Sequence, residues 1–287
     1  MNDPIFPLEW FRQLAARRIP VRLLNNYKGM PISNDAEIER IDEAGVVLSS
    51  HRYQIACLYL ARQTYIQLEA FQISLYARVA GIQLSKQKAL LADFEILRGR
   101  YCNRAQIRVE PEVAVLAEMR TRGGGDQVLA SLVDLSTQGL GILLERGLYH
   151  PRDFSPGEEI VLRFRLPVTT QKVSRLTAPL SPSLDLDERF SREKMRGIPQ
   201  SENPNNRNTA PLKTPPPDGL MNMRGIIRNI RPGLSANRYR IGVLITGLDD
   251  HGRLTLYQYV ASRQSELIRE LNALYEGLAR MGSQSFR

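Results

Sequence analysis

Cysteine and histidine are both scarce in this chain, and their scarcity argues against several kinds of chemistry. With only Cys57 and Cys102 present, a disulfide-stapled extracellular scaffold is not expected. The three histidines, His51, His150 and His251, lie about a hundred residues apart and show no metal-ligand spacing. Neither a metal site nor a nucleophile activated by histidine is therefore expected, and we do not expect an enzyme.

Long apolar runs and aromatic residues are also lacking. No apolar run reaches the roughly 18 residues that a membrane-spanning helix needs, so no membrane span is expected. The N-terminal stretch MNDPIFPLEWFRQLAARRIP does not have the basic start and apolar centre of a secretory signal, which favours a cytoplasmic protein. Aromatic residues make up 7% of the chain. A barrel that binds single-stranded nucleic acid needs aromatic stacking platforms, so a nucleic-acid polymer is not an expected partner.

Basic residues outnumber acidic ones. The chain has 39 Lys and Arg against 30 Asp and Glu, a formal net charge of +9 and a pI of about 9.8. This balance favours an anionic partner such as a nucleotide phosphate, although a surface that is merely basic would have the same composition. The length of 287 residues is enough for two modest domains.

The fold class expected is mainly all-β, with two small antiparallel barrels or split barrels and a C-terminal α-helix. In the first domain, residues 1–96, a short helix at 8–18 precedes segments that are rich in Val, Ile, Leu and Tyr and partly alternating. These expected strands are 20–24, 45–50, 54–61, 64–71 and 74–84.

The second domain, residues 97–280, contains six further segments of strand character, and short turns between most of them favour a small barrel. These segments are 105–120, 128–134, 140–145, 159–167, 225–231 and 239–248. RGGGDQ (122–127) predicts a hairpin turn, and Pro111 an edge or a bulge. An insertion at about 170–221 is so poor in apolar residues in its later part that we expect it to be disordered.

Helical spacing of apolar residues predicts a C-terminal helix, capped by Asp249 or Asp250, whose apolar side packs on the barrel. A coiled-coil or partner-docking role for it stays open, because the stripe is shorter than four heptads. The stripe consists of Tyr257, Val260, Leu267, Ile268, Leu271, Leu274 and Leu278.

Two short motifs carry the most specific chemistry. RYCNR (100–104) places Arg100 and Arg104 four residues apart, and a guanidinium suits both phosphate oxygens and the O6/N7 edge of guanine. DLSTQGLG (134–141) offers Asp134 as an acceptor for the donors of a guanine, with a hydroxyl at Ser136. Each motif alone is also compatible with a solvated arginine pair or with a plain Asx turn.

With both motifs in this order, the sequence resembles the PilZ family of bacterial cyclic-di-GMP receptors, whose signatures are R-x-x-x-R and [DN]-x-S-x-x-G. The resemblance covers about 98–165 and 222–275, and residues 1–95 are similar in layout to the N-terminal barrel of flagellar-brake-type members. It implies a signalling receptor that binds cyclic di-GMP and changes its interdomain orientation. The expected partner is the flagellar, secretion or polysaccharide machinery.

The resemblance also implies individual roles. Arg100 and Arg104 would bind the phosphates and guanine edges, while Asp134 and Ser136 would hold a guanine at its polar edge. Gly139 would let the turn approach the base. Two further residues are assigned more weakly: Arg98 as an additional phosphate contact, and Gly242 as the glycine of the family's late strand.

One departure from the family pattern is Gly99, which stands where many members have another arginine, so the number of ligand molecules bound is left open. A degenerate member that serves as a protein-interaction adaptor without ligand binding remains an alternative.

Overall fold

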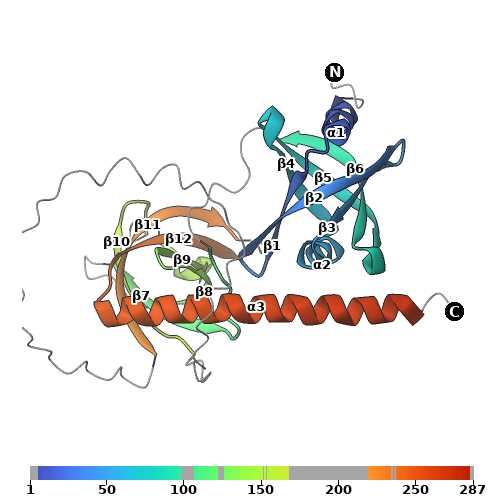
Figure 1. Ribbon diagram of the computed structural model, residues 1–287. Coiled ribbons are helices and arrows are strands. Elements are labelled where there is room, and N and C mark those ends of the chain that lie inside the picture. Colours follow the sequence, from blue (N-terminus) through green and yellow to red (C-terminus); the bar gives the residue numbers. More distant parts are fainter. Residues whose placement is uncertain are drawn as a thin grey trace, which may run out of the picture. The chain divides into compact units, whose positions relative to one another are not determined.

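The computed structural model describes residues 6–97, 107–121, 126–150, 152, 154–167, 219–233, 235 and 237–284. The described strands form two closed antiparallel barrels, and a long helix lies at the C-terminal end (Figure 1). The predicted fold class is therefore confirmed. The domain boundaries and the disorder of the insertion stay predictions, since residues 98–106 and 168–218 lie outside the described part.

The first barrel has the strand order β1-β2-β3-β6-β5-β4. Alternating apolar residues fill its interior, and α1 (Phe6–Ala16) adds Phe11 and Leu14 to this core. Two residues join β1 to β2, Lys28 and Gly29, and both have positive φ, as a two-residue hairpin turn requires. The strands are β1 (Val21–Tyr27), β2 (Met30–Asp42), β3 (Gly45–Ser50), β4 (Gln63–Leu68), β5 (Ile73–Gln83) and β6 (Lys88–Leu97).

The strand expected at 54–61 is wrong, because these residues belong to helix α2 (Arg52–Ala61). A short apolar run does not distinguish a buried helix from a buried strand by its period alone. His51 caps this helix by accepting a hydrogen bond from the Tyr53 N–H, at 3.4 Å. Strands β2 and β6 were not expected, since β2 in particular is largely polar on its outer face.

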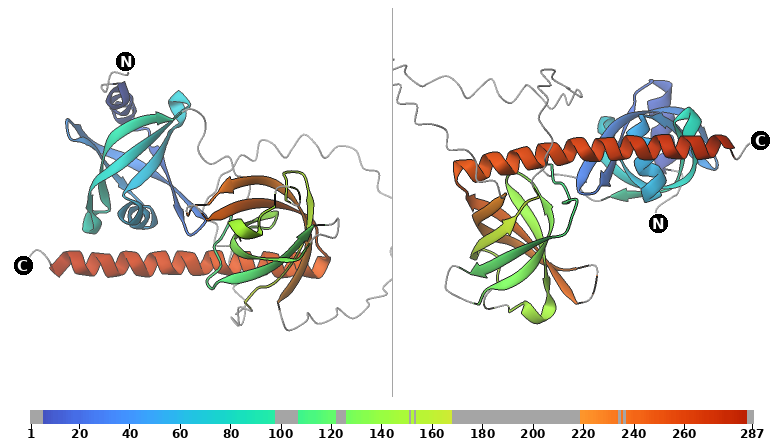
Figure 2. Two further views of the ribbon diagram at one scale, coloured as in Figure 1. Left: turned by 180° about the vertical axis from the view of Figure 1, so that it is seen from behind. Right: turned by 90° about the horizontal axis from the view of Figure 1, so that it is seen from below.

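The second barrel, coloured green to orange in Figure 2, has the strand order β10-β11-β12-β9-β8-β7, and the six expected strands are confirmed. The first of them begins ten residues later than expected, at Val115, and Val109 forms an isolated bridge before it. The antiparallel pairing of β7 with β8 confirms the predicted hairpin. The strands are β7 (Val115–Thr121), β8 (Val128–Leu135), β9 (Gly139–Glu145), β10 (Glu159–Arg165), β11 (Leu220–Pro232) and β12 (Arg238–Gly247).

Helix α3 (Asp250–Gln284) confirms the predicted C-terminal helix, and Asp249 caps it by accepting a hydrogen bond from the Gly252 N–H at 2.7 Å. The expected apolar stripe is partly wrong, because Tyr257 is 63% exposed and Ile268 38%. The residues that α3 buries include Leu256, Tyr259, Val260, Arg263, Leu267, Leu271 and Leu278. Within the described residues, no helix has the length and hydropathy needed to cross a membrane.

Candidate ligand site on the second barrel

The D-x-S-x-x-G motif forms the connection between β8 and β9. The Ser136 N–H donates to the Gly139 carbonyl oxygen at 2.8 Å, and the Ser136 hydroxyl both donates to that oxygen at 3.0 Å and accepts from the Gly139 N–H at 3.1 Å. Both residues are buried. The turn is therefore closed by its own serine, as small polar residues allow.

Asp134 lies at the end of β8, and its carboxylate is held between two arginines. Arg108 donates to Oδ1 at 2.9 Å, and Arg240, from β12, donates to Oδ2. The Asp134 side chain is 3% exposed, whereas Arg108 is 27% and Arg240 46% exposed. Three segments far apart in the sequence thus converge on one carboxylate. Two guanidinium groups face a single negative charge, which leaves one positive charge in excess.

A row of four residues crosses the strands next to this ion pair. Asp134 is paired with Gly141, Gly141 with Gly242, and Gly242 with Asn229 of β11. A Cβ at Gly141 would lie 2.9 Å from Asp134 Oδ2, and one at Gly242 would lie 2.9 Å from the Asn229 amide. The two polar side chains therefore lie over two glycines, and larger residues there would push them away.

Gly139 is required by packing and not by its backbone angles. A Cβ there would lie 2.6 Å from the carbonyl oxygen of Val243 on β12, well inside contact distance. This finding gives the motif glycine a structural reason that does not depend on a ligand.

The structure brings together Asp134, Ser136 and Gly139, and Gly242 lies in the row that begins at Asp134, two strands away from it. Arg98, Arg100 and Arg104 lie outside the described residues.

Sequence reasoning missed Arg240 and Asn229 and did not distinguish Arg108 from the other arginines. No local signal could have found Arg240, because its partner is 106 residues away in the sequence.

Of the comparisons with known proteins, the one with solved structures finds matches. No family model matches the sequence, and no curated protein matches it. Solved structures that match include the Bacillus subtilis inhibitor of motility MotI/DgrA, the K. pneumonia MrkH–c-di-GMP complex and Escherichia coli YcgR in complex with c-di-GMP. Their sequence identities are 10%, 11% and 13%, and their TM-scores 0.37, 0.39 and 0.36. The alignments cover 86%, 93% and 95% of this chain and 96%, 97% and 95% of those chains. At these values the likeness establishes neither a family nor a function.

Proposed function

We propose that this chain is a cytoplasmic cyclic-di-GMP receptor of the PilZ type and not an enzyme. Arg100 and Arg104 bind the phosphates and guanine edges of the ligand, with Arg98 as a further phosphate contact. Asp134 and Ser136 hold a guanine at its polar edge. Ligand binding changes the orientation of the two β domains and so regulates motility, secretion or exopolysaccharide production through a protein partner.

The observation that carries this proposal is the cluster of Arg108, Asp134 and Arg240 beside the motif turn. Its excess positive charge suits a dinucleotide with two phosphates, since charge-assisted hydrogen bonds from guanidinium to phosphate are among the strongest in proteins. The Asp134 carboxylate has about four acceptor positions, and its two arginines occupy two of them. The remaining acceptor positions of Asp134 can therefore bind the N–H donors of a guanine.

Covalent geometry limits the distance between the R-x-x-x-R motif and this cluster. Arg104 precedes Arg108 by four residues, and an extended chain spans at most about 3.6 Å per residue. Four residues of chain therefore span at most about 14 Å from the Cα of Arg108, whose side chain contacts Asp134. This limit is compatible with an Arg104 side chain that reaches a ligand bound at Asp134.

Calorimetric titration with cyclic di-GMP tests the proposal. If the affinity is micromolar, binding is worth about 8 kcal/mol, and loss of one charge-assisted arginine contact removes about 2–3 kcal/mol, or roughly 30- to 150-fold in Kd. We expect this loss in Arg104→Ala. Arg163→Ala is the matched control, because Arg163 is exposed on β10, two strands from β8 in the barrel order. Unchanged affinity in a folded Arg104→Ala protein would refute the assignment.

A base control sharpens the same experiment. Adenine has no N1–H and no exocyclic N2 donors to offer an acidic acceptor such as Asp134, so cyclic di-AMP should bind far more weakly. Equal binding of both dinucleotides would mean that only phosphates are recognised and that Asp134 does not read the base.

A second candidate, the protein-interaction adaptor, is favoured by one observation. Both oxygens of Asp134 already accept from arginines, and the Ser136 hydroxyl is satisfied within its own turn. The motif residues could therefore serve the fold alone. For an adaptor, cyclic di-GMP would produce no shift in melting temperature at millimolar concentration, whereas a receptor at 100 times its Kd gains about 2.7 kcal/mol.

A further inference from the structure

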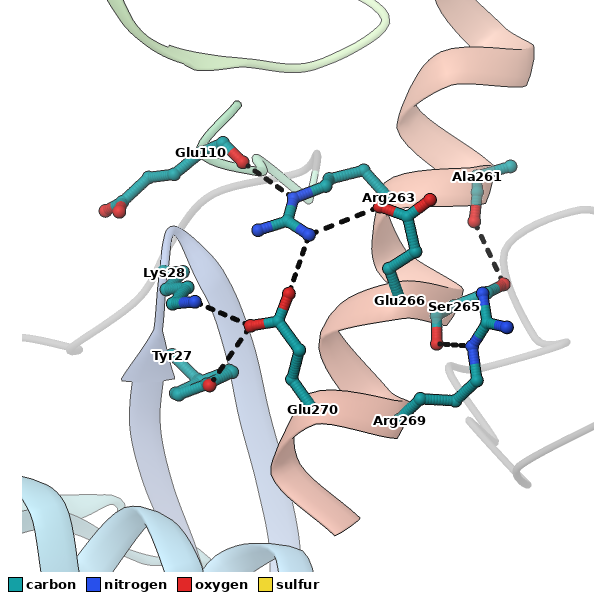
Figure 3. A network of polar contacts seen from close by, with 9 residues as sticks. All are labelled: Tyr27, Lys28, Glu110, Ala261, Arg263, Ser265, Glu266, Arg269 and Glu270. Atoms are coloured by element: carbon teal, nitrogen blue, oxygen red, sulfur yellow. Dashed lines mark hydrogen bonds and ion pairs between the residues drawn. The ribbon is translucent and has the colours of Figure 1, made fainter. Parts of the chain in front are cut away.

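Arg263 on α3 is a charged side chain that is almost fully buried, at 4% exposure. Its Nε donates to the carbonyl oxygen of Glu110 at 3.1 Å (Figure 3), and Nη1 donates to Glu270 Oε1 at 2.8 Å and to Glu266 Oε2 at 3.2 Å. Burial lowers the pKa of Arg263, but the hydrogen bonds that it donates to Glu270 and Glu266 more than compensate and raise the pKa above its ordinary value. Arg263 is therefore charged at every physiological pH.

Glu270 extends this network to the tip of the β1–β2 hairpin (Figure 3). Its Oε2 accepts from Lys28 Nζ at 2.5 Å and from the Tyr27 hydroxyl at 3.4 Å. The carboxylate of Glu270 thus has a cation on either side, Arg263 from its own helix and Lys28 from the hairpin turn.

Residues Arg108 to Glu110, here called the relay segment, connect this network to the candidate ligand site. Glu110 accepts from Arg263 through its carbonyl, and its N–H donates to the Lys28 carbonyl oxygen at 3.0 Å. Gly29 packs so closely that a Cβ there would lie 3.2 Å from the Glu110 nitrogen. One end of the relay segment is therefore fixed by α3 and by the hairpin tip.

The other end of the relay segment is fixed by the motif strand. Val109 and Leu135 exchange two backbone hydrogen bonds, of 2.9 and 3.0 Å, so the segment is bridged to β8 one residue beyond Asp134. Arg108 then donates its guanidinium to that carboxylate. Only one residue, Val109, lies between Glu110, which Arg263 fixes, and Arg108, which Asp134 binds.

We infer that Arg263 is a positioning residue for the ligand site. It acts through the relay segment: by fixing Glu110, together with Glu270 and Lys28, it sets the position of Arg108 beside Asp134. This inference rests on the proposed function for its effect on cyclic di-GMP, whereas its effect on the relay segment does not depend on any ligand. A buried ion network is suited to such a role, because its hydrogen bonds are all satisfied in one geometry. An apolar contact, in contrast, tolerates many geometries.

The test uses the full chain and amide hydrogen exchange, read residue by residue by NMR. In Arg263→Met we expect exchange of the Glu110 and Val109 amides to rise at least tenfold, while the Leu162 amide on β10 changes little. A role in overall stability alone would raise exchange throughout the barrel together. Arg263→Lys keeps a charge and three donors and should restore part of the protection. Arg269→Met is the matched control, since Arg269 is exposed on the same helix and donates to Ser265.

Cyclic-di-GMP calorimetry on the same variants gives the second readout, and Arg263→Met should raise Kd about tenfold. Unchanged exchange at Glu110 and Val109 in folded Arg263→Met would overturn the inference. If that variant does not fold, Glu270→Gln weakens the same network from the hairpin side, and unchanged Glu110 exchange there is equally contradictory. Should the wild-type chain not bind cyclic di-GMP, the proposed function fails, while the exchange data still decide the role of Arg263.

Discussion

Replacing Asp134 by Asn removes one negative charge from the arginine cluster and leaves the shape of the side chain almost unchanged. Hydrogen bonds to a charged group contribute about 1.5–3 kcal/mol when they are well shielded. Arg108 is 27% exposed and Arg240 46%, so solvent screening reduces both values. We expect about 1–1.5 kcal/mol from Arg108 and about 0.5–1 kcal/mol from Arg240, so Asp134→Asn should destabilise the second barrel by about 2 kcal/mol.

Double-mutant cycles of Asp134→Asn with Arg108→Gln and with Arg240→Gln separate the two ion pairs. Urea unfolding supplies the free energies, but the signal has to come from the second barrel. The single tryptophan, Trp10, packs against Phe71 and the core of the first barrel, so its fluorescence reports the unfolding of the first barrel and not of the second. Far-UV circular dichroism combined with NMR signals from β8 and β9 avoids this problem.

The ranking of the two coupling energies decides whether the reasoning holds. A coupling to Arg240 that equals or exceeds the coupling to Arg108 would show that exposure does not set the strength of these pairs. A loss below about 0.5 kcal/mol in Asp134→Asn would show that the carboxylate is not held by its arginines, since changes of that size are usual for surface positions. Asp126→Asn, at an exposed position just before β8, is the control expected to stay within that limit.

Three further predictions concern packing and ionisation. Gly139→Ala, which would put a Cβ 2.6 Å from a β12 carbonyl oxygen, should cost about 1–3 kcal/mol in the urea unfolding of the second barrel. Burial raises the pKa of the Cys57 thiol to about 12, so in a Cys102→Ser background Ellman's reagent should react at pH 8 only after unfolding. Burial raises the pKa of Glu270, but the hydrogen bonds from Lys28 and Arg263 outweigh burial and lower the pKa below its ordinary value. The stability that Glu270 contributes is therefore fully present above its unfolded pKa of about 4.3. This stability is lost as the pH falls through the lower pKa of the folded state. Melting temperatures of wild type and Glu270→Gln should therefore converge in acid.

Each of these has a clear contrary result. Wild-type stability in Gly139→Ala would mean that β12 can move away from the new methyl group without loss of free energy. Gly147→Ala is the control for this variant, since a Cβ at Gly147 meets nothing within 4 Å. Rapid labelling of folded Cys57 would contradict its burial. A constant difference in melting temperature between pH 7 and pH 3 would show that the ionised form of Glu270 is not the one that stabilises the fold.

Much of the fold could be predicted from the sequence, because the signals involved are local. Six strands of the second barrel follow from alternating apolar residues, and the cap of α3 follows from one aspartate before a helical stripe. The errors are equally local in origin. Residues 54–61 are too short an apolar run for the period to separate helix from strand, and β2 has too few apolar residues to show an alternation.

The candidate site could be predicted only in part. The turn of Ser136 and Gly139 is a local motif, and its closure by hydrogen bonds follows from residues three positions apart. The arginine partners of Asp134 are not local. Arg108 is placed by the isolated bridge between its neighbour Val109 and Leu135, and Arg240 by the pairing of β12 with β9.

The sequence by itself determined where strands, turns and helix caps form and which residue types stand in the two motifs, because backbone preferences and side-chain periods act over a few residues. Only the tertiary structure decided which charges meet. Barrel closure and strand register bring Asp134 to Arg240 across 106 residues, and the packing of α3 buries Arg263 next to the relay segment. A charge is stabilised by the groups within a few ångströms of it, and a local sequence pattern does not show which distant strands become neighbours when the barrel closes.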